Sequence, residues 1–580
     1  MAKTRTARAR ATAKRAKRPH AVIVGGGLAG LAAATLLARS GWRATVLERD
    51  ARPEADGGDD AFERWQREGV AQFRHSHTFL ARVTCVLRER LPEVLDLLRS
   101  RGALELPLTV ATPVGLDLGR RERGDGELVL LGCRRAAFEW ALWRVARSQP
   151  NVEIEERVFV EGLLADDGPD GARRVAGVRF RRLPVQPDPD RARGIPWFAA
   201  GRDPALRERG PERARVETLR ADLVVDASGR RSPAREWLRA IGAPAPRERS
   251  VPTGIFYYTR FYRLLGVRPQ GASTGLIAGD LGWIKVATFP GDANTFSITV
   301  GTNADDRPMR ALSEPAAFEA VIAAFPDIAR WRARGVSRPI DGPRTPVLVM
   351  GGLANRQRSF VRDGRPVATG FIAIGDAAYH TNPIYGRGAT CAILAAAALD
   401  DALRAHPGDL AAGALDYEER ARREIEPFWE AAAAADRANH ERAAASAFPL
   451  DPGRLLEIAR SPRRALAALL GRFIGIYFEY GIVPATRVDA TVYRAVMRVL
   501  NMLDDPRTSL LAPGVLVRVL PVLATALTVA RPARFAGPTR EEALAILDRV
   551  RSGRRGSGRR RSGVSAPRRL APDSDVAGHA

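Results

Sequence analysis

The sequence of 580 residues predicts an α/β fold: a parallel-sheet domain interleaved with an antiparallel-sheet α+β domain, followed by a helical C-terminal region. Two observations carry this prediction. Short apolar strand patterns alternate with helical patterns in the first part of the chain, which is typical of βαβ units. Aromatic and alternating segments between residues 251 and 349 indicate the hairpins of a second sheet.

The first strand ends at a glycine cluster in the segment V-I-V-G-G-G-L-A-G-L of residues 22–31. Gly25, Gly27 and Gly30 fit the pattern G-x-G-x-x-G. In that pattern the first glycine gives a tight turn, the second lets a pyrophosphate approach the backbone, and the third lets the helix pack against the strand. The following helix, expected to run to about Arg39, offers free N–H groups and its positive dipole end to phosphates.

A second strand, residues 44–47, leads directly into Glu48. This spacing from the glycine turn is expected of an acid that accepts a hydrogen bond from an adenosine ribose 2′-hydroxyl. A carboxylate there disfavours a 2′-phosphate, so these residues favour FAD or NAD over NADP in this pocket. Together the strand, turn, helix and acid predict a Rossmann-like dinucleotide domain.

The loop of residues 67–80 contains His75 and His77. No Cys/His/carboxylate cluster accompanies them, so they do not indicate a metal site. Their spacing alone favours a loop packed on its own domain over one that lies against a cofactor. Helical periodicity predicts one helix from Leu80 to Ser100 and another from Ala136 to Ser148.

Two further strands are expected, one on each side of a polar insertion. We expect strands near residues 152–154 and 219–225, the second ending at Asp226, and an insertion at residues 186–215, which are rich in Pro, Arg, Asp and Gly. In the second domain, residues 282–289 and 294–300 alternate in polarity and predict a hairpin.

A second strand–turn–helix corner follows this domain. Its strand ends at Gly375 and Asp376, and an Ala/Leu-rich helix starts near Gly388 and reaches about Arg404. A carboxylate at Asp376 suits sugar-like hydroxyls, and Gly386 with Gly388 would let the helix N-terminus approach a ring. A positive helix end would stabilise the negative charge of a reduced flavin. An ordinary corner without a ligand is the alternative.

The net charge of +25 raises the question of nucleic-acid binding, but its distribution argues against it. Residues 1–20 and 551–569 each hold eight basic residues and no acid, and the rest of the chain has 75 basic against 66 acidic residues. Three scattered cysteines fit a reducing cytoplasm. Neither a secretory signal nor a membrane-spanning run is visible.

These patterns divide the chain into six parts. We predict a disordered basic tail (1–19), a discontinuous cofactor domain (20–250 and 350–430), a substrate-binding sheet domain (251–349), a helical cap (431–550) and a disordered Arg-rich tail (551–580). Peripheral contact of the C-terminal helices with a membrane is the alternative to a plain cap.

Three ordered motifs carry a family resemblance. Residues 69–77, G-V-A-Q-F-R-H-S-H, are similar to G-V-P-Q-x-R-H-x-H, and residues 226–233, D-A-S-G-R-R-S-P, are similar to D-x-T-G-R-G-S-P. Residues 375–388 are similar to G-D-A…N-P-x-Y-G-x-G. Over roughly residues 20–430 the chain resembles the FAD-dependent monooxygenases of the para-hydroxybenzoate hydroxylase and squalene epoxidase superfamily, and looks closest to bacterial polyether-type polyene epoxidases.

The resemblance implies a GR2-type FAD domain and assigns roles to particular residues. The residues implied to bind FAD are Gly25, Gly27, Gly30 and Glu48 at the ADP half, Arg135, Asp226, Gly375 and Asp376 along the middle, and Arg74, Pro383, Gly386 and Gly388 near the ring. His75 and His77 are candidates for tuning the flavin or relaying protons. Three departures from the family pattern, at Ala71, His380-Thr381 and Ala389, indicate a different flavin edge.

The implied activity is a monooxygenase, either a hydroxylase or an epoxidase. It would transfer one oxygen atom from O2, through a flavin C4a-hydroperoxide, to an aromatic or olefinic small molecule of secondary or lipid/isoprenoid metabolism. NAD(P)H would supply electrons directly or through a separate flavin reductase, because Asp226-Ala227-Ser228-Gly229 is a variant of the D-G motif.

Three alternatives remain open at this stage. One is an FAD-dependent reductase or saturase of isoprenoid double bonds. Another is a flavin-dependent halogenase, which is disfavoured because Gly282-Trp283-Ile284-Lys285 lacks the second tryptophan of W-x-W-x-I-P. The third is a nucleic-acid binder built on the two basic tails.

Overall fold

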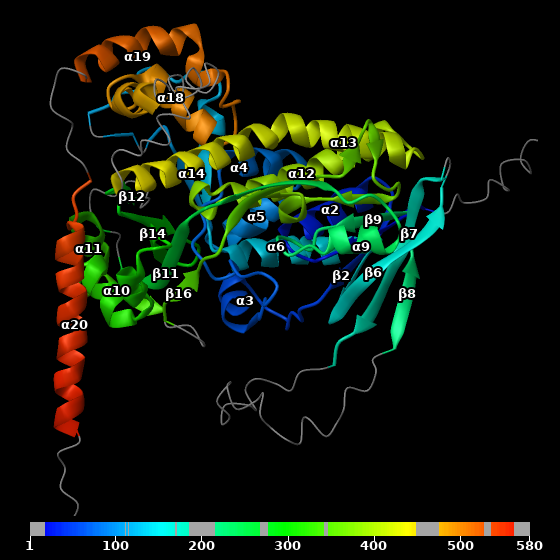
Figure 1. Ribbon diagram of the computed structural model, residues 1–580, viewed down its shortest axis with the longest axis horizontal. Helices are drawn as coiled ribbons and strands as arrows, with labels where there is room; N and C mark the ends of the chain where they lie inside the picture. Colours follow the sequence, from blue (N-terminus) through cyan, green and yellow to red (C-terminus); the bar gives the residue numbers. More distant parts are fainter. Residues whose placement is uncertain are drawn as a thin grey trace, which may run out of the picture.

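The architecture comes from a computed structural model, shown in Figure 1. It describes residues 18–110, 112–113, 115–168, 171–184, 215–266, 269, 277–340, 346–447, 475–526 and 535–561. Residues 1–17 and 562–580, and nearly all of the insertion expected at 186–215, lie outside the described residues.

A five-stranded parallel sheet forms the centre of the first domain, which confirms the predicted α/β class. Its strands lie in the order β20 (Phe371–Ala373), β9 (Leu223–Asp226), β1 (His20–Val24), β2 (Arg43–Glu48) and β5 (Val152–Glu156). Every residue of β1 is buried, as expected of an apolar strand with both faces covered. Helix α2 (Leu28–Arg39) packs against both α6 (Arg135–Arg147) and α12 (Arg387–Ala405).

The second domain is built on an antiparallel sheet. Its strands lie in the order β12 (Ile277–Asp280), β13 (Ile284–Pro290), β14 (Thr295–Asn303), β11 (Ile255–Leu264) and β15 (Ser337–Ile340), and β16 (Leu348–Met350) also pairs with β11. The predicted hairpin is β13–β14, and its turn places Ala293 and Asn294 at φ 51° and 56°. The aromatic residues Tyr258, Tyr262 and Phe296 are buried in the core under this sheet.

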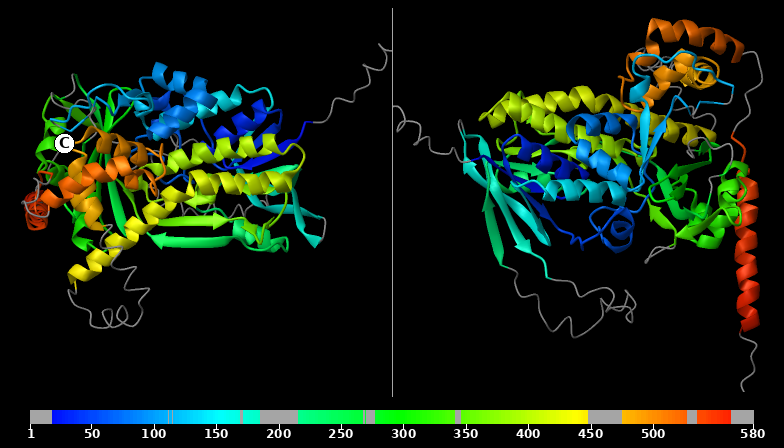
Figure 2. Two further views of the ribbon diagram at one scale, coloured as in Figure 1. Left: turned by 90° about the horizontal axis from the view of Figure 1, so that it is seen from above. Right: turned by 180° about the vertical axis from the view of Figure 1, so that it is seen from behind.

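Smaller sheets join the two domains. β10 (Arg247–Pro252) pairs with β17 (Ala354–Ser359), which pairs with β21 (Tyr379–His380), so the chain returns from the second domain beside its point of departure. A separate sheet of β6 (Val158–Asp167), β7 (Arg173–Arg182) and β8 (Val216–Arg220) lies at the end of the parallel-sheet domain opposite the β11–β14 sheet (Figures 1 and 2).

Two helices replace the single helix predicted for Leu80–Ser100. They are α4 (Ala81–Arg90) and α5 (Pro92–Ser100), with Leu91 between them at φ −141° and ψ 52°. Pro92 explains the break, because proline lacks an N–H and disfavours a helical residue before it, yet it suits the first position of a new helix. The prediction of one continuous helix was therefore wrong at Leu91.

The described parts of the C-terminal region are largely helical, and their helices pack in more than one place. α14 (Glu426–Ala447) crosses the expected boundary at residue 430, and α18 (Ala490–Leu500) and α19 (Pro513–Ala526) form a separate cluster with residues 477–485. α20 (Arg540–Arg561) instead packs on α10 (Pro315–Ile322) of the second domain and extends into the segment expected to be a tail. No helix among the described residues is long and apolar enough to cross a bilayer.

Candidate functional site

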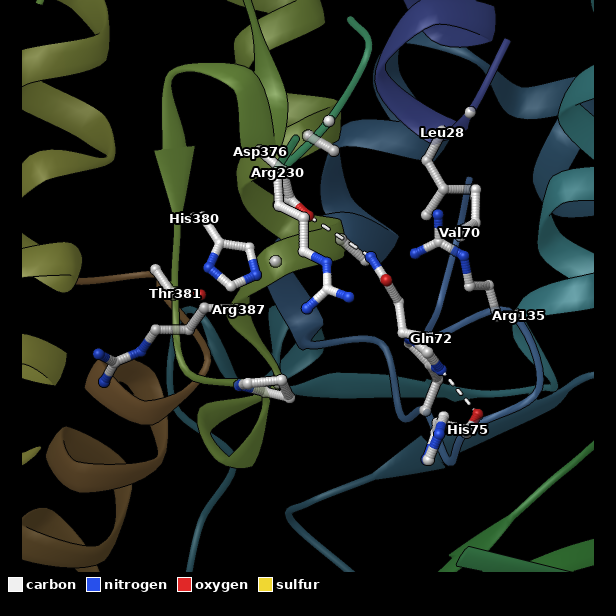
Figure 3. Close-up of a pocket in the computed structure, with 18 of the residues that line it drawn as sticks. Leu28, Val70, Gln72, His75, Arg135, Arg230, Asp376, His380, Thr381 and Arg387 are labelled. Carbon is white, nitrogen blue, oxygen red and sulfur yellow. Dashed lines mark hydrogen bonds between the residues drawn. The ribbon is translucent and has the colours of Figure 1, made fainter. Parts of the chain in front are cut away.

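A cavity of about 950 Å³ extends from the first glycine turn to the turn before α12 (Figure 3). This volume lies within the range of small-molecule and cofactor pockets, roughly 300–1,000 Å³. Ten of the residues predicted to form the site line it: Gly25, Gly27, Glu48, His75, His77, Arg135, Asp376, Pro383, Gly386 and Gly388. The structure thus brings residues from five separate segments of the chain to one cavity.

The glycine turn after β1 is shaped by close packing at two positions and by open space at the third. A Cβ at Gly25, which has φ +102°, would lie 2.6 Å from the Ala227 carbonyl oxygen, and a Cβ at Gly30 would lie 1.9 Å from the Gly25 oxygen. A Cβ at Gly27 would meet no atom within 4 Å. Gly30 therefore serves packing and lies outside the cavity wall, whereas Gly27 leaves room for a ligand.

Both helix N-termini at the cavity lack a side-chain cap. The N-cap of α2 is Gly27 and that of α12 is Gly386, and neither helix has a side-chain hydrogen bond at this position. Their first N–H groups have no partner within the helix and carry the positive end of the helix dipole. Two such ends facing one cavity favour a ligand with negative charge or acceptor groups at both ends.

Arg135, at the start of α6, supplies a buried cation that the protein satisfies only in part. Its Nη2 forms an ion pair with Glu139 Oε2 at 3.7 Å, but its buried Nε has no hydrogen-bond partner in the described structure. Burial lowers the pKa of Arg135, while Glu139 and Asp376 oppose that effect. A buried guanidinium needs a charged or polar partner, so the arrangement fits a phosphate of a dinucleotide.

Asp376 follows β20 and faces the same space from the other side (Figure 3). Gln72 Nε2 donates to its Oδ2 at 3.4 Å, which ties the histidine loop to the turn before α12. Two hydroxyls at the wall, Thr78 Oγ1 and Thr381 Oγ1, are buried and have no partner among the described residues. These unsatisfied groups also fit a ligand rich in polar atoms.

Glu48 differs from the expectation that it presents a free carboxylate to a ribose. Its Oε2 accepts from the Gly26 N–H at 2.8 Å and its Oε1 from the Asp50 N–H at 2.8 Å, while Arg67 binds both oxygens. Burial alone would raise the pKa of Glu48, but Arg67 and Arg52 lower it to about 2. Glu48 is therefore an ionised acid that holds the glycine turn.

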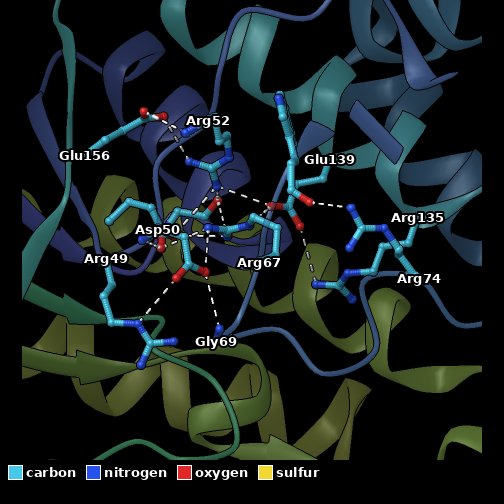
Figure 4. A network of polar contacts seen from close by, with 12 residues as sticks. Arg49, Asp50, Arg52, Arg67, Gly69, Arg74, Arg135, Glu139 and Glu156 are labelled. Atoms are coloured by element: carbon cyan, nitrogen blue, oxygen red, sulfur yellow. Dashed lines mark hydrogen bonds and ion pairs between the residues drawn. The ribbon is translucent and has the colours of Figure 1, made fainter. Parts of the chain in front are cut away.

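The arginines beside Glu48 belong to a buried ionic network that the sequence did not reveal (Figure 4). Arg67 Nε donates to Glu139 Oε1 at 2.7 Å, and Arg52 Nη2 donates to the same oxygen at 3.2 Å. Because Glu139 also pairs with Arg135, one helical turn earlier, the network links the glycine turn to Arg135. No sequence motif predicts this network, because Arg52 and Arg67 lie in loops and Glu139 lies inside helix α6.

Three other residues predicted for the site, Arg74, Asp226 and Gly375, do not line the cavity. Arg74 donates to the carbonyl oxygens of Phe62 and Trp65, both at 2.7 Å, and so ties its loop to the C-terminal end of helix α3 (Gly58–Arg64). Asp226 is fully buried and accepts from the hydroxyls of Ser228 and Ser232, and burial raises its pKa. Because the protein already engages both side chains, direct binding of the cofactor by Arg74 and Asp226 stays a prediction.

Gly375 is the third, and it permits a close approach of two elements. It has φ +59°, and a Cβ there would lie 2.9 Å from the Ala29 side chain at the start of α2. The glycine therefore lets the turn after β20 pack against the first helix. Gly375 brings the two ends of the site together without lining the cavity.

His75 and His77 both line the cavity, His75 as a buried and His77 as a half-buried side chain. His75 Nδ1 lies 3.2 Å from Thr259 Oγ1, and His77 Nδ1 donates to the His75 carbonyl oxygen at 2.9 Å. Burial lowers the pKa of His75 to about 4, and burial with the nearby Arg135 lowers that of His77 to about 3. Both rings are therefore neutral near pH 7.

Asp436, on α14, holds the turn before α12 from behind. It accepts from Asn355 Nδ2 at 2.6 Å, from Asn382 Nδ2 at 3.0 Å and from the Tyr385 hydroxyl at 3.1 Å. The Tyr257 hydroxyl completes the cluster by donating to Asn382 Oδ1. The sequence placed Asp436 in a remote helical region, and only the fold brings it to this turn.

Comparisons with known proteins agree with this fold. Residues 23–76 match the family model described as an NAD(P)-binding Rossmann-like domain. The solved structure of the flavin-dependent brominase Bmp2 is similar, with a TM-score of 0.51 and 14% identity over 84% of this chain and 94% of that chain. A probable FAD-dependent monooxygenase from Pseudomonas aeruginosa, pqsL, has a TM-score of 0.45 and 18% identity over 73% of this chain and 95% of that chain.

The sequence relationship that decides the family is with a mycobacterial protein. Over 420 residues the chain is 30% identical to protein Rv3254 of Mycobacterium tuberculosis (strain ATCC 25618 / H37Rv), which covers 68% of this chain and 75% of that protein. Because the identity extends over most of both chains, the likeness is not confined to the nucleotide-binding turn. The chain therefore belongs to the family of protein Rv3254.

Proposed function

We propose that this protein is an FAD-dependent monooxygenase that acts on a small organic molecule with O2. The observation that carries the proposal is the cavity between the N-termini of α2 and α12, with Arg135, whose buried Nε has no hydrogen-bond partner in the described structure, at its wall. A dinucleotide that carries a redox-active ring has a negatively charged pyrophosphate in the middle and hydrogen-bond acceptors at both ends. In this cavity the cation of Arg135 would meet the pyrophosphate, and the N–H groups of the two helix N-termini would meet acceptors of the ligand.

Different residues of the cavity would bind different parts of the cofactor. The α2 N–H groups, with space left at Gly27, would bind the pyrophosphate together with Arg135. Asp376 would accept from hydroxyls of the ribityl chain, and the α12 N-terminus at Gly386 and Gly388 would stabilise negative charge at the ring edge. When bound, FAD would supply the electron transfer and the activation of O2.

The protein would also supply a pocket from which water is excluded and in which the polar groups near the ring keep fixed positions. Walls from Leu80, Leu130 and Met497 exclude water on one side, and the neutral His75 faces the same space. Within this function, similarity to polyether-type epoxidases stays a prediction, as does the choice between direct reduction by NAD(P)H and a separate flavin reductase. A saturase of isoprenoid double bonds would use the same cofactor site without O2.

The proposal is tested by reconstituting the purified protein with FAD and following NADPH oxidation. We expect a yellow protein with quenched flavin fluorescence, and O2 consumption once a substrate is bound. Adding a general flavin reductase distinguishes direct reduction from reduction by a partner. Turnover that proceeds equally well under anaerobic conditions would support the saturase, and a colourless protein would exclude both activities.

A further inference from the structure

A chain of hydroxyl groups runs from His75 along the cavity wall beside β11 and β14. Ser76 Oγ donates to Ser297 Oγ at 2.7 Å, and Thr299 Oγ1 donates to Ser76 Oγ at 2.6 Å. Thr259 Oγ1 lies 2.8 Å from Thr299 Oγ1 and 3.2 Å from His75 Nδ1. Four side-chain hydroxyls thus form one continuous series of hydrogen bonds that ends at the imidazole.

The direction of this series follows from counting hydrogens, because each hydroxyl has only one to donate. The Ser76 hydrogen is used toward Ser297, and the Thr299 hydrogen is used toward Ser76. Thr259 must therefore donate to Thr299. Its oxygen is left as the acceptor for His75, so His75 carries its hydrogen on Nδ1.

This tautomer leaves Nε2 of His75 as a lone-pair acceptor. Within the described structure no hydrogen bond engages this atom, and His75 lines the cavity. His77 has the same tautomer, since its Nδ1 donates to a carbonyl oxygen. The wall beside β11 therefore presents a neutral acceptor to whatever lies in the cavity.

We propose that His75 is a specificity-determining residue that accepts a hydrogen bond from an O–H group of an uncharged substrate. The proposal rests on the proposed function, because it assigns the substrate class of the same cavity. A carboxylate or phosphate would place lone pairs against the lone pair of Nε2, so the site would disfavour an anion at this point. A molecule in which the hydroxyl is replaced by an ether would leave Nε2 without a partner.

The tautomer itself can be measured without flavin or turnover, by NMR of protein labelled with ¹⁵N-histidine. We expect a protonated Nδ1 and an unprotonated Nε2 for His75 near pH 7. Thr259→Val should release this preference and Thr259→Ser should retain it. Thr84→Val is the matched control, because the Thr84 hydroxyl is buried elsewhere and has no partner among the described residues. A proton on Nε2 in the wild type, or no change in Thr259→Val, would overturn the proposal.

The recognition is tested by calorimetry of the FAD-loaded protein with 4-propylphenol and with 4-propylanisole, in which an O–CH3 group replaces the O–H donor. We expect the phenol to bind about tenfold more tightly, a difference of about 1.4 kcal/mol. In His75→Phe the ratio should fall to about one. Equal binding of both probes to the wild type would overturn the assignment of His75, whereas failure to bind FAD would refute the proposed function and leave the NMR result interpretable.

Discussion

The Arg67 guanidinium binds both carboxylate oxygens of Glu48, at 2.9 Å (Nη1–Oε1) and 3.0 Å (Nη2–Oε2). The N–H groups of Gly26 and Asp50 take the remaining acceptor positions of the same carboxylate. A carboxylate has about four lone-pair positions, so Glu48 is fully engaged by the protein. The acid at the end of β2 therefore fixes the glycine turn through Arg67, which makes Arg67 the residue whose removal is most informative.

Arg67→Met should destabilise the protein by about 3–5 kcal/mol, because it leaves Glu48 and Glu139 buried without their main cation. Chemical unfolding measures the effect. Arg39→Met is the control, since Arg39 pairs with Glu93 on the surface, where an ion pair contributes about 0–1 kcal/mol. Equal effects of the two substitutions would contradict a structural role for the network.

Substitution of two glycines should separate folding from cofactor binding. Gly30→Ala should lower the unfolding temperature strongly, because its Cβ would collide with the Gly25 carbonyl oxygen. Gly27→Ala should leave that temperature nearly unchanged and weaken FAD binding about tenfold or more, because its Cβ enters open space where the pyrophosphate would lie. Thermal melts without FAD and fluorescence titrations with FAD measure the two effects. Full FAD affinity in Gly27→Ala would argue against a phosphate site at this turn.

Stability should fall with pH between about 6.5 and 4 because of the buried histidines. The pKa of His75 is lowered to about 4 and that of His77 to about 3, each from 6.5, so in this window the unfolded chain binds protons that the folded chain does not. The unfolding free energy therefore decreases as pH falls. His75→Gln should reduce this pH-dependent change by about 2 kcal/mol. Substitution of the more exposed His406 is the control, and an unaltered slope in His75→Gln would show that His75 is protonated when folded.

Asp436→Asn should loosen the turn before α12 from a distance. The new amide would oppose the Asn355 and Asn382 amides that now donate to the carboxylate. We expect a loss of about 1–3 kcal/mol in stability and weaker FAD binding. Glu430→Gln, on the same helix, removes only surface pairs with Arg507 and Arg249 and should change neither property. If Asp436→Asn binds FAD as tightly as the wild type, the turn does not depend on this carboxylate.

Much of the fold could be predicted because its signals are local. Gly25, Gly27 and Gly30 identify the first βαβ unit from spacing alone, and the Ala/Leu-rich pattern after Gly388 identifies α12. The site was predicted less completely, since the contacts that define it are long-range. Arg67 meets Glu139 across 72 positions, and no pattern predicts such a pair.

Arg74 and Asp226 were expected at the cofactor from their motif positions, but a motif does not say which way a side chain points. In the fold, Arg74 donates to the carbonyl oxygens of Phe62 and Trp65, 12 and 9 positions earlier in the chain, and Asp226 accepts from the serines that follow it. Direct binding of the cofactor by either residue stays a prediction.

A crystal structure of the protein grown with FAD tests the central claim most directly. The account predicts one FAD in the cavity, with its pyrophosphate at the α2 N-terminus and within hydrogen-bond distance of Arg135, and with its isoalloxazine ring beside Pro383, Gly386 and Gly388. Crystals without flavin, or a flavin bound at any other surface with no contact to Arg135, would contradict it.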